Sequence, residues 1–480
     1  MKITSATKQL RIIPLIYLTL LFLGIFIRPS VGALVKKDSI RSSALPIAPV
    51  ADTVVTEHPS EPFAWGDFTW LNGNDRRHSA ILDSKYFTGR VLLDVNYTAS
   101  NQHPIDHTVV GSTALARDNE FQVSVAAMGG DFHYDNVRAS ILLQLGTRST
   151  VVPRNDYSVL HGQFDLANAY RYVSEANAGY HFDVWHGINV DAGLFMSYVG
   201  LFSYYNVENW AYQPSFTSDN TPWYFNGLRI QTFPTDRLKI ELWLVNGWQA
   251  YGKFNNGPGV GFQILWRPEE WFSILTNNYY GTDVEGLPDR IRFHTDNSAE
   301  VRYMNSPGSF IHRAAFSATG DIGLEKGGGV SGLSGGDEGP KQFFESWMIY
   351  HRLWMANDHI GWTFGGGYMN NPGRYLVLYP TGAANPIPES NTGAVGSHPF
   401  SANPGDKFHG WDVSTTLDWM PNEYITWRAE VVHRETDIPY FAGPGGVTSP
   451  SGNNSLPDPN WVPDLVKSET RFIGALLVRF

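Results

Sequence analysis

Two groups of residues have types and spacings that could support metal binding or hydrolysis. His103 and His107 lie four residues apart, and Asp283, His294 and Asp296 could supply the Asp–His pair of a hydrolase. The two histidines lie in a proline-interrupted stretch and do not share a helix face, and the sequence contains no HExxH motif. We interpret both groups as solvated polar residues of loops. The sequence therefore predicts no catalytic residue and no metal site.

Cofactor and nucleic-acid binding are also disfavoured. The glycine-rich stretch 327–336 lacks the Lys-Ser/Thr pair of a phosphate-binding loop. The absence of cysteine excludes disulfides, thiolate zinc sites, iron–sulfur clusters and CxxCH haem attachment. A net charge of −11 argues against nucleic-acid binding, which needs clustered Lys and Arg. We expect no cofactor and no nucleic-acid partner.

A further group consists of charged residues that recur at one parity of alternating segments. Arg428 and Glu430 alternate with the apolar residues Trp427, Ala429 and Val431. If the apolar parity faces lipid, the charged parity faces a water-filled lumen and influences which ions pass. Replacing Arg428 with Glu would then shift selectivity toward cations with little effect on stability.

The same parity rule, applied along the chain, gives a set of predicted pore-lining residues. Charges of both signs suit an aqueous channel, and they could also pair across strands and stiffen the wall. The set is Arg90, Asp94, Arg138, Asp191, Lys239, Glu241, Glu300, Arg302, Arg313, Asp412, Asp418, Arg428, Glu430 and Arg471.

The elements that position these residues are predicted to be β-strands. Segments such as 87–97, 137–145, 188–198 and 238–245 alternate apolar and polar residues with a period of two. Each is about 9–12 residues long, the length that a tilted strand needs to cross a bilayer. No segment after the N-terminal region approaches the roughly 18 uninterrupted apolar residues of a membrane helix.

The connections between these segments alternate in length. Short connections carry turn residues, as in Pro234–Asp236 and Ser306–Gly308, whereas long ones are rich in Gly, Pro, Asn and Asp. Strict alternation is typical of an up-and-down barrel with turns at one rim and large loops at the other. The sequence therefore predicts an all-β fold: a transmembrane antiparallel barrel of about 16 strands, with short periplasmic turns and long extracellular loops.

The N-terminus predicts export. Three basic residues precede the apolar run 12–27, and Val31 and Ala33 occupy the −3 and −1 positions of a cleavage site. We expect residues 1–33 to be a signal peptide, residues 34–62 to be a disordered periplasmic segment, and residues 63–480 to form the barrel. An uncleaved N-terminal anchor helix is the alternative.

Aromatic residues and the C-terminus also favour an outer-membrane barrel. The chain has 16 Trp, 23 Tyr and 28 Phe, and many Trp and Tyr lie near predicted strand ends, as expected for interfacial girdles. The alternative is that they are ordinary core aromatics. The last ten residues form an amphipathic strand that ends on Phe480. Such an ending resembles the closing strand of bacterial outer-membrane barrels, which the assembly machinery reads.

Three short stretches resemble one family. The segment Glu61–Asn74, the stretch Val245–Gln249 and the stretch Tyr205–Trp210 are similar to the β-barrel porin-2 (OmpL-like) family. The resemblance would cover roughly residues 60–480. It implies an outer-membrane diffusion channel and no catalytic residues.

Together these patterns predict a porin-like channel of the bacterial outer membrane for passive diffusion of small hydrophilic solutes. The expected partners are outer-membrane lipids, the barrel-assembly machinery, small solutes or ions, and a second copy of the chain if the barrel oligomerises. A barrel enzyme of the lipid-hydrolase type and a surface-binding adhesin remain as alternatives. The sequence does not give the solute or the loop that narrows the pore.

Overall fold

A computed structural model describes residues 61–480 except 157, 159–160, 254–256, 285, 379, 381–399, 401–402 and 454–460. The predicted signal peptide and almost all of the predicted disordered segment lie outside the described residues. Within the described residues, no helix is long and apolar enough to cross a membrane.

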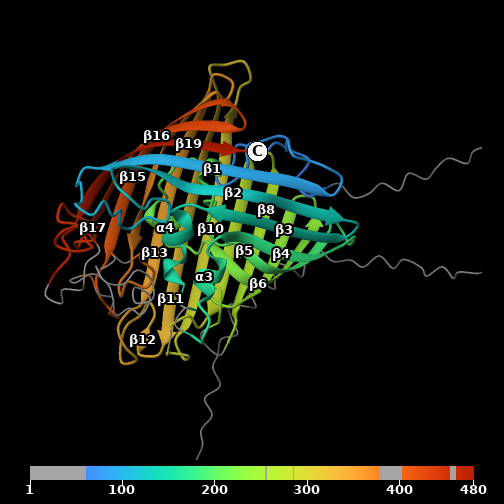
Figure 1. Ribbon diagram of the computed structural model, residues 1–480. Coiled ribbons are helices and arrows are strands. Elements are labelled where there is room, and N and C mark those ends of the chain that lie inside the picture. Colours follow the sequence, from blue (N-terminus) through green and yellow to red (C-terminus); the bar gives the residue numbers. More distant parts are fainter. Residues whose placement is uncertain are drawn as a thin grey trace, which may run out of the picture. The chain divides into compact units, whose positions relative to one another are not determined.

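Sixteen antiparallel strands form the wall of a closed barrel. Every wall strand pairs with its neighbours in sequence, so the topology is up-and-down throughout (Figure 1). The strands are β1 (Phe87–Ser100), β2 (Glu120–Tyr134), β3 (Val137–Leu145), β4 (Val173–Phe182), β5 (Ile188–Met196), β6 (Tyr224–Thr235), β7 (Leu238–Val245), β8 (Gly259–Glu269), β9 (Phe272–Gly281), β10 (Ile291–Asn305), β11 (Ile311–Gly327), β13 (Phe343–Met355), β14 (Ile360–Asn370), β15 (His409–Asn422), β16 (Ile425–Thr436) and β19 (Ser468–Arg479).

The first and last strands close the barrel. β1 and β19 pair from Leu92 opposite Arg479 to Ser100 opposite Arg471, and they lie side by side in blue and red in Figure 1. Phe480 exchanges two backbone hydrogen bonds with Val91, of 2.8 and 3.0 Å. Closure matters because an open strand edge in lipid would leave its backbone N–H and C=O groups unpaired.

Connections alternate between turns and long loops, which confirms the predicted architecture. The short connections comprise residues 135–136, 183–187, 236–237, 270–271, 306–310, 356–359 and 423–424. The long ones comprise residues 101–119, 146–172, 197–223, 246–258, 282–290, 328–342, 371–408 and 437–467. We call the rim that carries the short turns the periplasmic rim, following the orientation predicted from the sequence.

Short elements lie within the long loops, and none of them belongs to the sixteen-stranded wall. They are α2 (Arg148–Val151), η1 (Pro153–Asn155), α3 (Leu166–Tyr170), η3 (Asn206–Glu208), α4 (Phe216–Asp219), β12 (Val330–Ser331), β17 (Phe441–Ala442) and β18 (Leu465–Val466).

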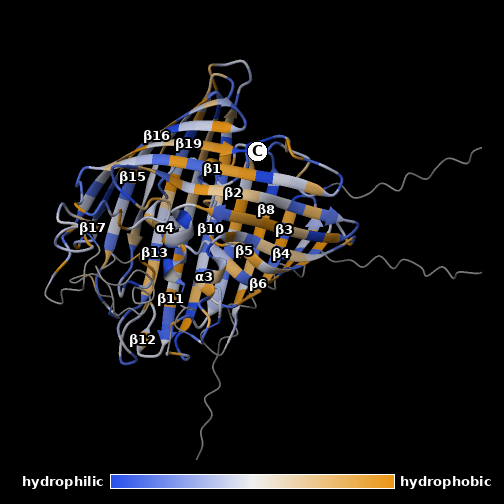
Figure 2. Ribbon diagram, viewed as in Figure 1, coloured by the Kyte–Doolittle hydropathy of each residue, from blue (hydrophilic) through white to orange (hydrophobic). Residues whose placement is uncertain are grey.

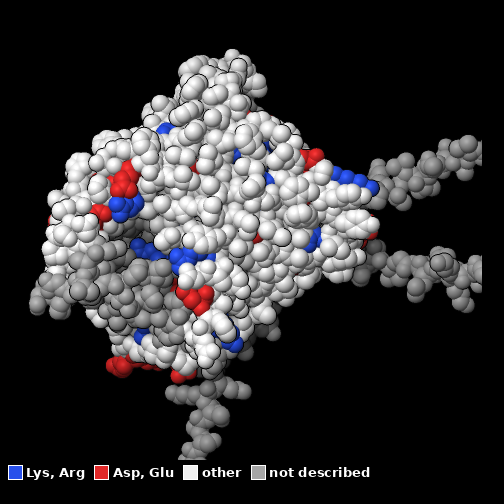
Figure 3. Space-filling model, in the orientation of Figure 1, with Lys and Arg blue, Asp and Glu red and all other residues white. Residues whose placement is uncertain are grey.

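Side chains alternate across the wall as the period of two requires. Along β16, Trp427, Ala429 and Val431 are exposed on the outer surface, whereas Arg428 and Glu430 are buried inside the barrel. The hydropathy colouring shows the same change of colour along the strands (Figure 2). On the face shown in Figure 3, few charged side chains lie over β1, β2 and β3. An apolar outer surface of this kind suits contact with lipid.

Candidate functional site

The loop between β5 and β6 folds into the barrel. We call residues 197–223 the inward loop; it contains η3 and α4, and nearly all of its residues are buried. Its aromatic side chains include Tyr204, Tyr205, Trp210 and Tyr212, which bury much apolar area inside the lumen. The burial of these rings gives a physical reason for the loop to enter the barrel.

Two charges of β16 hold the inward loop by its backbone. The Glu430 carboxylate accepts hydrogen bonds from the backbone N–H groups of Tyr212 (2.6 Å) and Gln213 (2.8 Å). Arg428 donates to the backbone carbonyls of Asn206 (3.2 Å) and Asn209 (2.7 Å). Backbone groups of a buried loop need such partners, because an unpaired buried N–H or C=O is costly.

Carboxylates of two other strands bind the loop as well. Asp94 of β1 accepts from Asn206 Nδ2 (2.9 Å) and from the Tyr212 hydroxyl (2.7 Å). Asp412 of β15 accepts from Ser215 Oγ (2.8 Å) and from the backbone N–H of Phe216 (2.9 Å). The inward loop is therefore fixed to strands on both sides of the barrel closure.

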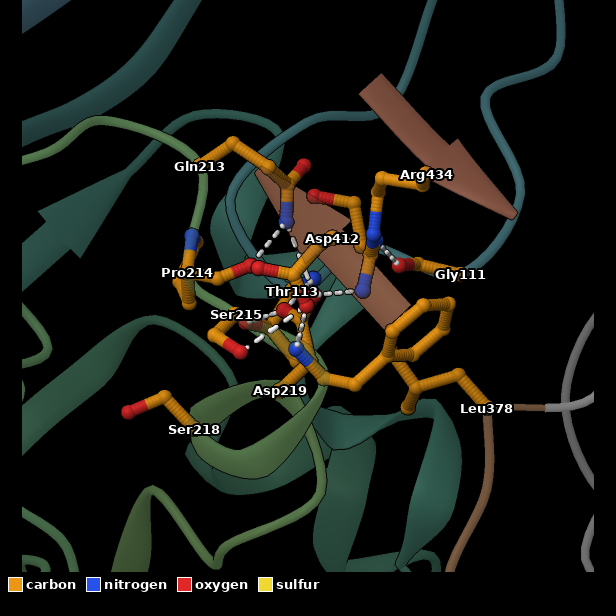
Figure 4. Close-up of polar contacts among 12 residues, drawn as sticks. Gly111, Thr113, Gln213, Pro214, Ser215, Ser218, Asp219, Leu378, Asp412 and Arg434 are labelled. Atoms are coloured by element: carbon orange, nitrogen blue, oxygen red, sulfur yellow. Dashed lines mark hydrogen bonds and ion pairs between the residues drawn. The ribbon is translucent and has the colours of Figure 1, made fainter. Parts of the chain in front are cut away.

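Asp219 of α4 is the centre of a further cluster (Figure 4). Its carboxylate accepts from the backbone N–H (2.9 Å) and hydroxyl (2.7 Å) of Thr113, accepts from Gln213, and pairs with Arg434 of β16 at 3.1 Å. Burial raises the pKa of Asp219 above its ordinary value, although Arg434 and Thr113 favour the charged form. The cluster ties the inward loop to loop 101–119, since Arg434 also donates to the Gly111 carbonyl.

A second element enters the barrel at the periplasmic end. We call residues 61–79 the N-terminal segment; Phe68, Trp70 and Leu71 are buried, and Trp70 donates its indole N–H to the Glu270 carbonyl at 3.0 Å. The backbone N–H of Phe63 bonds the Asp236 carbonyl at 2.7 Å. Asp236 and Glu270 both lie in short turns of the periplasmic rim, so the segment lies across the periplasmic mouth.

Wall charges bind the polar side of the N-terminal segment. Asp67 pairs with Arg313 at 3.2 Å and lies 3.9 Å from Arg302, and the backbone N–H of Asn72 donates to Glu300 at 2.8 Å. Burial tends to raise the pKa of Asp67, but hydrogen bonds from Thr69 and the charge of Arg313 outweigh it and bring the pKa below its ordinary value. Asp67 is therefore held as a carboxylate.

The two inserted elements also contact each other. The backbone N–H of Trp210 donates to Asn72 Oδ1 at 2.8 Å, and its indole donates to the Trp70 carbonyl at 3.2 Å. The backbone N–H of Gly73 bonds the Glu208 carbonyl at 3.1 Å. The inward loop and the N-terminal segment thus form one continuous obstruction from the middle of the lumen to its periplasmic mouth.

Beside this obstruction lies a cavity of about 290 Å³, which we call the chamber. Asn72, Trp223, Lys239, Gln263 and Arg267 are among the residues that line it. The buried Asn72 Nδ2, Trp223 Nε1, Gln263 Oε1 and Arg267 Nε atoms have no hydrogen-bond partner among the described residues. The wall of the chamber therefore includes charged and amide side chains, as a site for water or a polar solute would.

The structure places the fourteen predicted charges in three groups. The charges that bind or support the inward loop are Asp94, Asp412, Asp418, Arg428, Glu430 and Arg471. Those that bind the N-terminal segment are Glu300, Arg302 and Arg313. Those that pair along the wall are Arg90, Arg138, Asp191, Lys239 and Glu241. That these groups line a conducting path stays a prediction.

Arg428 differs from the sequence-based expectation in one respect. Its side chain is only 2% exposed and forms an ion pair with Asp418 at 2.7 Å. Glu at this position would face Asp418 and release the carbonyls of Asn206 and Asn209. The structure therefore predicts a destabilised inward loop rather than a simple change of selectivity.

Several inward charges were not among the predicted pore-lining residues, and the N-terminal segment was not predicted to enter the barrel. Arg434 shares the parity of Arg428 and Glu430, so the same rule could have found it. Arg352 of β13, which pairs with Asp418 at 2.8 Å, was detectable in the same way. The four aromatic rings of residues 63–70 were the signal that this stretch does not stay in solvent.

The residues considered for hydrolysis are not solvated, which corrects that interpretation. Asp283, His294 and Asp296 are all buried, because Trp248 and Tyr375 from the long loops pack nearby. His294 Nε2 lies 2.5 Å from a carboxylate oxygen of Asp321, so its ion-pair partner is neither Asp283 nor Asp296. Of the two histidines considered for metal binding, His103 lies near Asp118 and His107 lies near Glu120. Among the described residues, no cluster of three His, Cys, Asp or Glu could hold a metal ion.

We expect Glu430→Ala to loosen the inward loop. The change leaves two buried backbone N–H groups unpaired, at a cost of about 1–3 kcal/mol each. The denaturation midpoint in detergent should fall, and conductance through single barrels should fluctuate more than in the wild type. Glu435→Ala, at an exposed position of the same strand, is the matched control. Equal stability and equal current noise in both variants would show that Glu430 does not hold the loop.

A family model described as "Putative beta-barrel porin-2, OmpL-like" matches residues 86–480. Among solved structures, an anion-selective porin from Comamonas acidovorans is 9% identical with a TM-score of 0.47, over 82% of this chain and 99% of that chain. OprB of Pseudomonas putida at high pH is 12% identical with a TM-score of 0.46, over 82% of this chain and 94% of that chain. The outer membrane channel DcaP of Acinetobacter baumannii is 8% identical with a TM-score of 0.45, over 84% of this chain and 100% of that chain. A comparison with curated proteins finds no match.

Because the family match runs from the residue before β1 to the last residue, this chain belongs to the β-barrel porin-2 (OmpL-like) family.

Proposed function

We propose that this porin-like barrel lets small hydrophilic solutes and ions diffuse passively across the bacterial outer membrane. The observation that carries the proposal is the polar chamber of about 290 Å³ inside a closed barrel with an apolar outer surface. A barrel of about 16 strands is wide enough to leave an aqueous channel. The inward loop narrows that channel, and the polar side chains that line the chamber favour hydrated or hydroxylated solutes over apolar ones.

Conductance of the purified protein in a planar bilayer tests this function. We expect discrete current steps with salt on both sides, together with swelling of liposomes in small neutral solutes. An enzyme or an adhesin would give neither. A folded, heat-modifiable barrel that passes no current and no solute would overturn the proposal and favour those alternatives.

Charges at the chamber are expected to bias the permeating ions. Lys239 lies at the chamber wall and pairs with Glu241 at 2.9 Å. Lys239→Gln removes one positive charge, leaves Glu241 without its lysine partner, and should shift the reversal potential in a salt gradient toward cations. The shift should shrink at high salt, because ions screen fixed charges. An unchanged reversal potential would indicate that ions do not pass near Lys239, and Lys326→Gln, in a strand end near the long loops, is the control.

Targeting completes the proposed pathway. We infer that residues 1–33 are removed during export, that residues 34–62 stay in the periplasm, and that the assembly machinery reads the strand ending at Phe480. Sequencing the purified barrel from its N-terminus should give Leu34 first. Recovery of intact Met1 would instead support an uncleaved anchor.

A further inference from the structure

A further cavity, of about 260 Å³, lies at the periplasmic rim between the N-terminal segment and two of the short turns. We call it the mouth pocket. Arg76 and His78 of the segment line it, together with Asn357, His359 and Glu423 of the turns. The described residues that line it do not line the chamber, so the mouth pocket is a separate space, and its volume suits a small molecule.

A narrow recess of about 30 Å³ adjoins the mouth pocket on its lumen side. Arg76, Trp354 and Met420 line both spaces, whereas Asn209 and Trp210 of the inward loop line the recess and not the mouth pocket. A recess of this volume holds about two water molecules. A ligand in the mouth pocket can therefore extend a small polar group into the recess.

The recess is lined by more arginines than carboxylates that could pair with them. Arg76, Arg352 and Arg428 line it together with Asp418. Asp418 pairs with Arg428 at 2.7 Å and with Arg352 at 2.8 Å, so these two arginines share one carboxylate. The three arginines and Asp418 leave two positive charges in excess.

The other three acids that line the two spaces already have basic partners. The pairs are Glu208 with Arg479, Asp358 with Arg313, and Glu423 with His78. A cation held away from water without a paired anion is costly, and these acids do not remove that cost for Arg76.

Arg76 is the arginine that keeps free donors. Its Nη2 atom donates to the backbone carbonyls of Asn422 and Ile425, both at 2.8 Å, and to the Thr426 hydroxyl at 3.1 Å. These partners are neutral, and among the described residues no carboxylate forms an ion pair with Arg76. Its Nε atom is buried and has no hydrogen-bond partner in the same part of the chain.

The surroundings of Arg76 disfavour its positive charge. Burial lowers the pKa of Arg76 to about 10, helped by the charges of Arg352 and Arg428 and opposed by that of Asp418. A phosphate group would supply the missing negative charge, because it carries about −1.5 to −2 charges at pH 7. Its oxygens also accept the charge-assisted hydrogen bonds that a guanidinium group donates.

We propose that the recess and the mouth pocket bind a small phosphate compound from the periplasm, and that this ligand locks the N-terminal segment in the mouth. Arg76 belongs to the segment, whereas Arg352 and Arg428 belong to the wall, so an anion among them joins the two parts. A lipid headgroup stays outside the wall and does not reach the site, because Arg352 and Arg428 are buried inside the barrel. The inference concerns binding and not conduction, so a barrel that passes no current would leave it standing.

Equilibrium binding of inorganic phosphate to the folded barrel, in neutral detergent and chloride buffer, tests the site. The wild type should bind one phosphate per barrel. Arg76→Gln should lower the affinity about tenfold or more, the loss expected for a charged hydrogen bond, and Arg76→Lys should fall between the two because it keeps the charge without the planar fork. Heat-modifiable migration shows whether each variant is folded.

Arg117→Gln is the matched control, because it removes an exposed arginine of loop 101–119 and should bind phosphate like the wild type. A wild type that binds no phosphate would overturn the proposal. Equal affinity in the wild type and in folded Arg76→Gln would overturn it as well, since the phosphate would then bind elsewhere.

Hydrogen exchange tests the locking of the N-terminal segment. Phosphate should slow the exchange of backbone amides in residues 61–79 severalfold, because a ligand that binds the docked segment stabilises it. Exchange in β2 should stay unchanged, and phosphate should have no effect on the segment in Arg76→Gln. A segment that exchanges equally fast with and without bound phosphate would refute the lock.

Discussion

Deleting residues 61–79 should raise the single-channel conductance several-fold. The N-terminal segment crosses the periplasmic mouth, and its ring Trp70 is completely buried inside the barrel. Its removal exposes Glu300, Arg302 and Arg313 to water, which can hydrate them. It also takes away the Asn72 contacts that hold Trp210 of the inward loop. Current steps in planar bilayers and the rate of liposome swelling would both report the change.

Two further variants make this prediction decisive. Deleting residues 34–60 alone should leave the conductance at the wild-type value, because the obstruction remains. Cysteines in place of Phe63 and Asp236, whose backbone N and O atoms lie 2.7 Å apart, would tether the segment by a disulfide in this cysteine-free chain. Oxidation should then lower the residual current, and a reductant should restore it. A folded barrel without residues 61–79 that conducts no better than the wild type would show that the segment does not limit the flow.

Val431→Arg is expected to cause the largest loss of assembly. Val431 lies on the outer surface of β16, opposite Thr415 of β15 and Phe472 of β19. A charged arginine placed there faces hydrocarbon, at a cost of about 2–4 kcal/mol near the midplane of the bilayer. The heat-modifiable fraction in outer membranes, and the folded fraction in liposomes, should both fall steeply.

The control for this variant is Val431→Leu, which keeps an apolar side chain at the same position and should assemble normally. The few Val431→Arg barrels that do insert should conduct like the wild type, because the change lies outside the lumen. Normal assembly of Val431→Arg would mean that this face of β16 does not contact lipid.

The sequence by itself determined the class of the fold. A period of two in apolar residues is a local property, since neighbouring side chains of a strand point to opposite faces. The alternation of turns and long loops is equally local. The two patterns together predict the barrel and the inward orientation of charges such as Arg428 and Glu430.

The tertiary structure decided what fills the barrel. Periodicity gives the face of a strand on which Glu430 lies, but it does not identify the backbone groups that the carboxylate meets. Those groups belong to Tyr212 and Gln213, more than two hundred positions away in the sequence. The same holds for Asp67 and Arg313. Contacts of this range depend on the closed barrel, which brings an inward loop and an N-terminal segment into one lumen. The inward charges would be predicted from the sequence to line water. In the structure many of them instead bind the inward loop and the N-terminal segment and hold both in the lumen, because buried charges and buried backbone groups must satisfy each other.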